Sequence, residues 1–279
     1  MEPIQGNVSI DAQNIMPIIK KWLYSDKDIF IREVVSNGCD AITKLRMVDS
    51  AAAQNCSIHV EVDKAARELR FIDDGVGMTE DEVKTNINQV AFSGAKSFME
   101  EYAKNEDQEN SGIIGHFGLG FYSVFMIADK VTIDTLSFRE GATPVRWESE
   151  DGMAFTMTEG TRATRGTTIT LHVSEAESEF LEVWRVREVL DRYCSFMSVP
   201  IYLDEIKEEE AKVTGEGAEE KPEEKKEEPK PINDTQPLYA RAPQDCTDED
   251  YKQFYRKVFH EYEDPLFWIH LNVDYPFKL

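Results

Sequence analysis

Residues 57–73 read SIHVEVDKAARELRFID and predict an antiparallel β-hairpin. In the first half of this stretch apolar residues alternate with polar ones, which is typical of a strand with one buried face. The chain then returns as a second strand that ends at Asp73. The apolar residues of the pattern are Ile58, Val60, Val62, Leu69 and Phe71.

Helices are expected on both sides of this hairpin, followed by strands with short turns between them. A helix over 25–46 begins at Ser25, where Asp28 three residues on resembles a capping box. A shorter helix capped by Asn14 precedes it, and Thr79 caps another. Further strands are expected at 131–136, 145–149, 154–158, 168–173 and 201–203, with a helix at 177–195. This order favours an α+β fold, a two-layer sandwich in which helices cover one face of a mixed, mostly antiparallel sheet. A doubly wound parallel sheet would need strict βαβ alternation.

A charged tract divides the chain. Residues 204–230 hold 12 acidic and six basic side chains and no aromatic residue. Such a segment buries too little apolar surface to offset its ordering entropy, so residues 208–231 are expected to form a flexible linker. We therefore expect an N-terminal domain over 1–207 and the start of a second domain over 232–279. In the second domain the pattern predicts a helix at 247–262 and a strand at 266–273.

The composition limits the classes of partner. The chain carries 54 acidic and 31 basic residues, a formal net charge of −23, which argues against binding to nucleic acid. One small phosphate ligand is still possible, because backbone dipoles can hold it whatever the net charge. The four cysteines lie far apart, which favours reduced thiols over a zinc site or a disulfide framework. With no signal-peptide pattern and no apolar run of about 18 residues, we expect a soluble cytoplasmic protein without membrane contact.

The helix over 25–46 carries a polar stripe on one face, because its members are spaced at i, i+4, i+7, i+8 and i+11. They are Glu33, Asn37, Asp40, Ala41 and Lys44. A solvated amphipathic face explains most such stripes. A carboxylate one turn before a carboxamide can also orient water beside a magnesium-bound phosphate, with Asn as the neutral oxygen ligand. Gly38 lies in mid-helix, where glycine costs ~1 kcal/mol relative to alanine, and we expect it to permit the close approach of a ligand.

The segment 73–78, DDGVGM, follows a strand and precedes a capped helix. It is either a tight turn with a capping aspartate or a site that reads a base. In the second case Asp73 accepts a hydrogen bond from the amino group of an adenine. The glycines let the backbone approach the ring, and Met78 packs on it.

The segment 115–121, GHFGLGF, is rich in glycine near an expected helix start. Backbone N–H groups there can bind an anion with help from the helix dipole, although plain loop glycines are the alternative. Neither the dinucleotide fingerprint nor a Walker motif occurs. Residues 93–120 are expected to form a hinged lid. His116 is interpreted as a spacer, and 165–168, RGTT, alone indicates an ordinary turn into a strand.

Taken in order, these segments resemble the ninety-kilodalton heat-shock chaperones, and in particular their bacterial members. The resemblance rests on WLYSDKDIFIREVVSNGCDAITKLR (22–46), IDDGVGMT (72–79), IGHFGLGFYSVFMIADKV (114–131) and GTTITLHV (166–173). It covers most of 10–205, and 231–279 resembles the opening of the family's middle domain. Two features depart from the family pattern. Phe92 stands before Ser93-Gly94 where a basic residue is usual, and the charged linker is more typical of eukaryotic members.

The resemblance implies a Bergerat-type fold that binds ATP and Mg²⁺ on the helical side of its sheet. It gives Glu33 the role of positioning the attacking water, Asn37 that of binding Mg²⁺, and Asp73 that of receiving the adenine amino group, with Thr167 assisting through a water. The other residues assigned to the nucleotide are Asp40, Ala41, Gly77, Met78, Asn86, Gly115, Gly118, Leu119, Gly120 and Phe121.

The resemblance implies a chaperone ATPase. Such a protein closes its lid, acts on unfolded client proteins and forms a homodimer at full length. In isolation this fragment should bind ATP well and hydrolyse it poorly, because the family draws a phosphate-sensing arginine from further along the middle domain. A nucleotide-gated binding module in which hydrolysis is incidental is the alternative. A histidine-kinase role lacks a histidine before residue 59, and a gyrase-like role is disfavoured by the charge.

Overall fold

The computed structural model describes residues 26–89, 98, 113, 115, 118–206, 229–259 and 262–271. The expected helix capped by Asn14, the lid opening at Phe92, and His116 lie outside the described residues. The chain divides into two compact units. The first comprises residues 1–195 and 199–233, and the second comprises 196–198 and 234–279.

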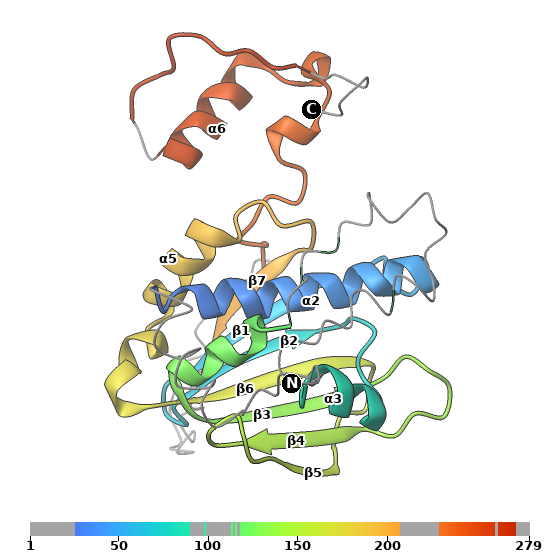
Figure 1. Ribbon diagram of the computed structural model, residues 1–279. Coiled ribbons are helices and arrows are strands. Elements are labelled where there is room, and N and C mark those ends of the chain that lie inside the picture. Colours follow the sequence, from blue (N-terminus) through green and yellow to red (C-terminus); the bar gives the residue numbers. More distant parts are fainter. Residues whose placement is uncertain are drawn as a thin grey trace, which may run out of the picture. The chain divides into compact units, whose positions relative to one another are not determined.

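The first unit is built on a seven-stranded sheet with the order β5-β4-β3-β6-β2-β1-β7 (Figure 1). Only the β1–β7 pair is parallel, and every other pair is antiparallel. The predicted mixed, mostly antiparallel sheet is thus confirmed. The strands are β1 (Ile58–Asp63), β2 (Glu68–Asp73), β3 (Ala128–Leu136), β4 (Val145–Ser149), β5 (Thr156–Glu159), β6 (Gly166–Val173) and β7 (Ile201–Glu205).

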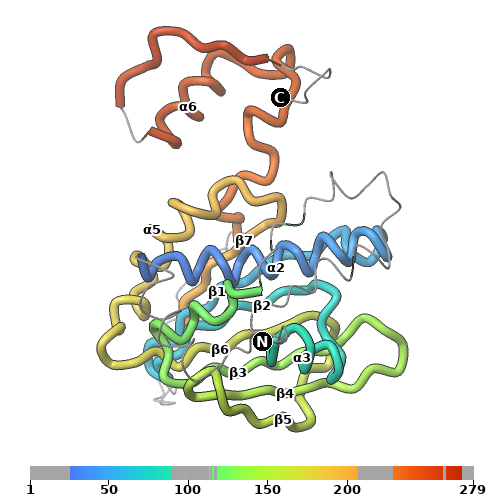
Figure 2. Tube along the Cα trace, in the orientation of Figure 1, coloured from blue at the N-terminus to red at the C-terminus, as the bar shows by residue number. Residues whose placement is uncertain are grey.

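Helices cover one face of this sheet. The 20-residue helix α2 (Ile29–Val48) runs over β1 and β2 (Figures 1 and 2). In β1 and β2, which lie beneath it, every second residue is buried and the residues between are half-exposed. Each strand therefore has one buried face and one half-exposed, mostly polar face. Among the described residues, this unit also contains α3 (Glu80–Asn86), α5 (Val183–Tyr193) and the 3-10 helices η2 (Gly120–Met126) and η3 (Glu175–Leu181). The two-layer α+β architecture is as predicted.

Among the element boundaries that differ from the prediction, two have a clear physical reason. The helix expected at 177–195 is broken at Glu182, whose extended backbone (φ −96°, ψ 119°) makes it the N-cap of α5. The break is needed because Leu181 is buried while Trp184, three residues on, is 65% exposed, and a continuous helix would place both on one face. The strand expected at 154–158 begins instead at Thr156, because Ala154 belongs to a turn held by Ser149 Oγ and the Asp151 carboxylate.

After the charged tract, the chain returns to the first unit at strand β7. The backbone N–H of Ile232 donates to the carbonyl of Ile201 over 2.9 Å. The Asn233 side chain accepts from the Ile201 N–H and donates to the Val199 carbonyl, both over 2.9 Å. Its carboxamide therefore pairs with the strand as a backbone amide would, and residues up to 233 belong to the first unit.

The second unit contains the 3-10 helices η4 (Leu238–Ala240) and η5 (Pro243–Asp245) and the helix α6 (Asp248–Phe259). Phe196, Tyr239 and Phe254 form an aromatic cluster with ring centroids 5.5–6.1 Å apart. The strand predicted at 266–273 is wrong for 266–271, which form no strand. A strand needs a partner for its backbone groups, and none occurs among the described residues of this unit.

None of the four cysteines forms a disulfide, and burial raises the pKa of the Cys39 and Cys194 thiols to about 12. Over the described residues, none of the helices combines the length and apolar character that crossing a membrane requires.

Candidate functional site

The polar stripe of α2 faces the glycine-rich segment. The carboxylate of Asp40 accepts a hydrogen bond from the backbone N–H of Gly115 over 2.7 Å. A Cβ built on Gly115 would lie 3.6 Å from Oδ1 of Asn37, and one built on Gly120 would lie 2.2 Å from Oε2 of Glu33. A Cβ at Gly120 would collide with the Glu33 carboxylate and force that side chain to move, and one at Gly115 would lie only 3.0 Å from Oδ2 of Asp40. The stripe and the glycine segment therefore form one cluster.

The glycine segment continues into a helix near the start that its sequence predicted, and this helix is a 3-10 helix. Gly118 has φ +63°, a conformation that favours glycine, and η2 starts two residues later at Gly120. Phe121 is buried against Trp147, with ring centroids 5.8 Å apart, and Tyr122 donates its hydroxyl to the carbonyl of Ile87. These contacts fix the end of the segment to β4 and to the C-terminal end of α3.

Glu33 is oriented by its neighbour in the chain. Arg32 donates to Oε1 of Glu33 from Nη2 over 2.6 Å and from Nε over 3.2 Å. Both hydrogen bonds go to the same carboxylate oxygen, and the other oxygen, Oε2, is directed toward Gly120. One carboxylate oxygen is thus held by a cation, and the other faces the glycine segment.

Asp73 forms the second cluster, at the end of β2. Its side chain is buried and accepts a hydrogen bond from the Gly75 N–H over 2.8 Å. Burial raises the pKa of this carboxyl to about 7, against the lowering effects of the Gly75 N–H, the Arg162 guanidinium and the backbone of Thr167. A buried carboxylate of this kind is an acceptor that favours a ligand donor over water.

The two clusters meet where α2 lies against the sheet. A Cβ built on Gly38 would lie 3.1 Å from Ile58 Cδ1 and 3.5 Å from Asp73 Cβ. The interpretation of Gly38 as an opening for a ligand is therefore corrected: the space is filled by the sheet, and glycine lets the helix approach Asp73. Since Asn37 is the preceding residue, the acid–amide stripe and Asp73 lie on the same side of the sheet.

The glycines of the DDGVGM loop have the same kind of role. A Cβ on Gly75 would lie 2.5 Å from Cβ of Ala41, and one on Gly77 (φ +61°) would lie 1.9 Å from the carbonyl oxygen of Leu136. The loop is thus held between α2 and β3. These glycines permit close packing of protein against protein, whereas the sequence had suggested the approach of a ring.

Thr167 lies beside Asp73, because the two are directly paired between β6 and β2. Its hydroxyl is 3.0 Å from that of Thr135 on β3, which in turn accepts from the N–H of Met78 over 2.9 Å. Arg162 supports the same corner by donating to the carbonyl of Asp73 over 2.9 Å. Thr135 and Arg162 were missed from sequence, since one is an ordinary β-branched strand residue and the other an ordinary loop cation.

Most of the predicted residues thus fall into two adjoining clusters. Glu33, Asn37, Asp40, Gly115 and Gly120 form the first, with Gly118, Leu119 and Phe121 next to them in the chain. Ala41, Asp73, Gly77, Met78 and Thr167 form the second. Asn86 lies half-buried at the end of α3, and no described hydrogen bond or ion pair connects it to either cluster.

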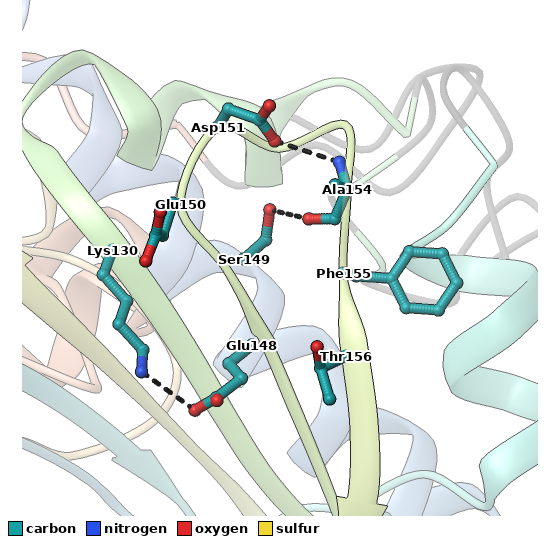
Figure 3. A pocket seen from close by; sticks show the side chains of 8 residues that line it. All are labelled: Lys130, Glu148, Ser149, Glu150, Asp151, Ala154, Phe155 and Thr156. Atoms are coloured by element: carbon teal, nitrogen blue, oxygen red, sulfur yellow. Dashed lines mark hydrogen bonds and ion pairs between the residues drawn. The ribbon is translucent and has the colours of Figure 1, made fainter.

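A separate hollow of about 240 Å³ lies at the β4–β5 turn (Figure 3). Its lining residues are Lys130, Glu148, Ser149, Glu150, Asp151, Ala154, Phe155 and Thr156. Their polar groups largely bind one another, as in the Lys130–Glu148 ion pair at 3.1 Å and the Asp151–Ala154 turn bond. None of the predicted site residues contributes to it.

Comparison with known proteins gives two matches to family sequence models. The one described as "Hsp90 protein" matches residues 218–279, and the one described as "Histidine kinase-, DNA gyrase B-, and HSP90-like ATPase" matches residues 30–152.

Similarity to individual proteins extends over nearly the whole chain. It is 44% identical over 283 residues to the chaperone protein HtpG of Porphyromonas gingivalis and 45% over 280 residues to that of Bacteroides fragilis, covering 99% of this chain and 39% of each relative. With HtpG of Nitrosococcus oceani the identity is 40% over 273 residues, covering 95% of this chain and 41% of the relative. The chain therefore spans about two fifths of the length of the curated relatives it matches.

Proposed function

The chain belongs to the Hsp90 family of chaperones, and from this premise we propose that its first unit binds ATP with Mg²⁺ and hydrolyses it to drive the folding of client proteins. The observation that carries the proposal is the joining of two clusters on one face of the sheet. A glycine segment lies against the carboxylates and amide of α2, and a buried aspartate lies beside the same helix at the end of β2.

The residues fit a magnesium-bound triphosphate in two respects. Glycines stand where a Cβ would collide with Glu33 or approach Asp40, so the backbone N–H groups of this segment are close to the acid–amide stripe. The amide oxygen of Asn37 is a neutral ligand suited to Mg²⁺. No group of three or more His, Cys, Asp or Glu among the described residues could hold a metal by itself, so Asn37 would share the ion with phosphate oxygens.

Each side chain then has a task. Bound MgATP supplies the phosphoanhydride bond and the positive charge that screens the phosphates. Glu33, held by Arg32, orients and polarises the attacking water through its free oxygen. The N–H groups of the glycine segment stabilise the negative charge that develops. Asp73 accepts from the purine amino group, and Thr167 contributes beside it.

Lid closure over the nucleotide, a homodimer and a cytoplasmic location complete the proposal for a protein of the relatives' full length. The sequence of residues 93–120 supports the lid. ATP would shift the lid toward its closed state only to the extent that it binds the closed state more tightly than the open state.

Base recognition is tested by calorimetric titration of ADP into wild type, Asp73→Asn and the control Asp134→Asn. Asp134 lies on the solvent-facing side of the same sheet, where it pairs with Arg146. We expect Asp73→Asn to lose ADP binding. The –NH₂ group of the asparagine is a donor, and it must face another donor, either the Gly75 N–H or the amino group of the ligand. The control should bind like wild type. Equal affinity in all three proteins would reject the base-reading role.

Catalysis is tested in a chimera in which this chain replaces the matching 39% of Porphyromonas gingivalis HtpG. Glu33→Ala should keep ADP affinity and abolish ATP turnover. Unchanged turnover would reject the role of Glu33. Lost turnover with normal client refolding would favour the alternative, a binding module gated by nucleotide.

A further inference from the structure

Three polar side chains form one row across the buried face of the sheet. Asp73 on β2 pairs with Thr167 on β6, and Thr167 pairs with Thr135 on β3. Directly paired residues of adjacent strands point to the same side of a sheet. All three are buried, and Thr135 has no exposed surface. Polar groups in such a place need defined hydrogen-bond partners.

The hydroxyl of Thr135 makes three contacts, and their directions can be assigned. It has one proton to donate and two lone pairs that accept. The carbonyl of Gly166, at 3.1 Å, can only accept, and the N–H of Met78, at 2.9 Å, can only donate. The third contact, with the Thr167 hydroxyl at 3.0 Å, is satisfied together with the others only if Thr167 donates. The Thr135 hydroxyl therefore accepts a hydrogen bond from the Thr167 hydroxyl.

We propose that Thr135 is a positioning residue that sets nucleotide specificity, because it directs the Thr167 proton away from the ligand, so that Asp73 and Thr167 both present acceptors to the base. The carboxylate of Asp73 and the oxygen lone pairs of Thr167 then face the purine together. A base with an amino group at this position donates to them. A base with a carbonyl oxygen there meets acceptors alone, so 6-amino purines are selected over 6-oxo purines.

The neighbouring backbone keeps this arrangement from adapting to the wrong base. Asp73 accepts from the N–H of Gly75 and from the backbone of Thr167, so its carboxylate cannot turn freely. Thr135 is held at three points, and if the Thr167 hydroxyl turned its proton toward a ligand, one buried lone pair of Thr135 would lose its donor. Leaving a buried polar group without its partner is unfavourable, so the arrangement resists the change that the wrong base would need.

The inference rests on the proposed binding of ATP and is tested by calorimetric titration of ADP and inosine diphosphate, which differ in the base at the 6-amino or 6-oxo position. Titrations at pH 8 keep Asp73 ionised, since its pKa lies at about 7. Wild type should prefer ADP by about a hundredfold or more, as expected when acceptors alone face a carbonyl. In Thr135→Val the Thr167 hydroxyl can rotate and donate, so the ratio of the two affinities should fall by about tenfold. Thr135→Ser keeps the hydroxyl and should keep the ratio.

Thr167→Val supplies a second route to the answer if Thr135→Val fails to fold, because it leaves the Met78 and Gly166 contacts of Thr135 intact. It removes the opposing acceptor and should lower the ratio in the same way. Adding Thr135→Val to it should change the ratio no further. A ratio that stays at the wild-type value in folded Thr135→Val, or in Thr167→Val, would overturn the inference. Failure of wild type to bind ADP at all would instead overturn the proposed function.

Discussion

Asp73 should make the first unit less stable as the pH rises from 4 to 7. Burial raises the pKa of its carboxyl from 3.8 to about 7 in the folded chain. Below pH 3.8 the group is protonated in both states and has no effect on the pH dependence. Above it the unfolded chain loses the proton first, so the free energy of unfolding falls until the folded chain is ionised as well, near pH 7.

The magnitude follows from the size of the shift. One pKa unit corresponds to about 1.4 kcal/mol, so a shift of about three units is equivalent to about 4 kcal/mol. Asp73→Asn removes the ionisation but keeps the shape of the side chain. Relative to wild type, the free energy of unfolding of the variant should therefore rise by up to about 4 kcal/mol between pH 4 and pH 7.

The assay is urea unfolding without nucleotide, followed by circular dichroism at several pH values from 4 to 8, in wild type, Asp73→Asn and Asp134→Asn. Other carboxylates cancel in the difference between wild type and variant. Asp134 is half-buried on the outer face and paired with Arg146, so its variant should show no gain with pH comparable to that of Asp73→Asn. A difference between wild type and Asp73→Asn that is the same at pH 4 and pH 8 would refute the reasoning.

Three further substitutions probe the contacts around the site. Gly120→Ala should reduce ATP turnover in the chimera by about a hundredfold with ADP affinity retained, because its Cβ would lie 2.2 Å from Oε2 of Glu33 and must displace it. Arg162→Met should cost about 2–3 kcal/mol in urea unfolding, because it removes the hydrogen bond to the Asp73 carbonyl and others nearby. Asn233→Ala should speed hydrogen exchange at the amide it binds on β7 by about tenfold, because both of its side-chain bonds are lost.

Each of these has a clear contrary result. Normal turnover in Gly120→Ala would mean that Glu33 can move without loss of catalysis. Arg162→Lys serves as the control for its site, and it should recover only part of the stability because an ammonium lacks the planar fork of guanidinium. Wild-type stability in Arg162→Met would contradict the support assigned to this side chain. Unchanged exchange at Ile201 in Asn233→Ala would show that the returning segment does not hold strand β7.

The sheet and the polar stripe of α2 could be predicted because each follows from the short-range spacing of apolar and polar residues along the sequence. Alternation in 58–62 gave β1, and the spacing of Glu33, Asn37 and Asp40 placed them on one helix face. The base-reading role of Asp73 rested on its position after a strand, and the structure puts it beside α2. Local patterns were sufficient for these because each depends on residues within one element.

What could not be predicted depends on contacts between distant parts of the chain. Gly38 shows no local reason for its lack of a side chain, which becomes clear only when Ile58 and Asp73 lie against it. Thr135 reads as a plain strand residue, and its importance comes from Thr167, 32 positions away. The strand expected at 266–273 does not form over its described part, 266–271, for the same reason, since alternation alone does not supply a partner strand.

Helix α2 is continuous from Ile29 to Val48, and it contacts both the glycine segment and Asp73. The helix therefore fixes the distance between the two clusters that the proposed nucleotide contacts. The distance from Glu33 to Asp73 is set by this one uninterrupted helix, which packs directly on the sheet. A ligand that is shorter or longer than this reach cannot engage both ends at once. Any adjustment to the length of the proposed nucleotide would have to come from the glycine segment, where the backbone N–H of Gly115 is bonded to the Asp40 carboxylate of the helix.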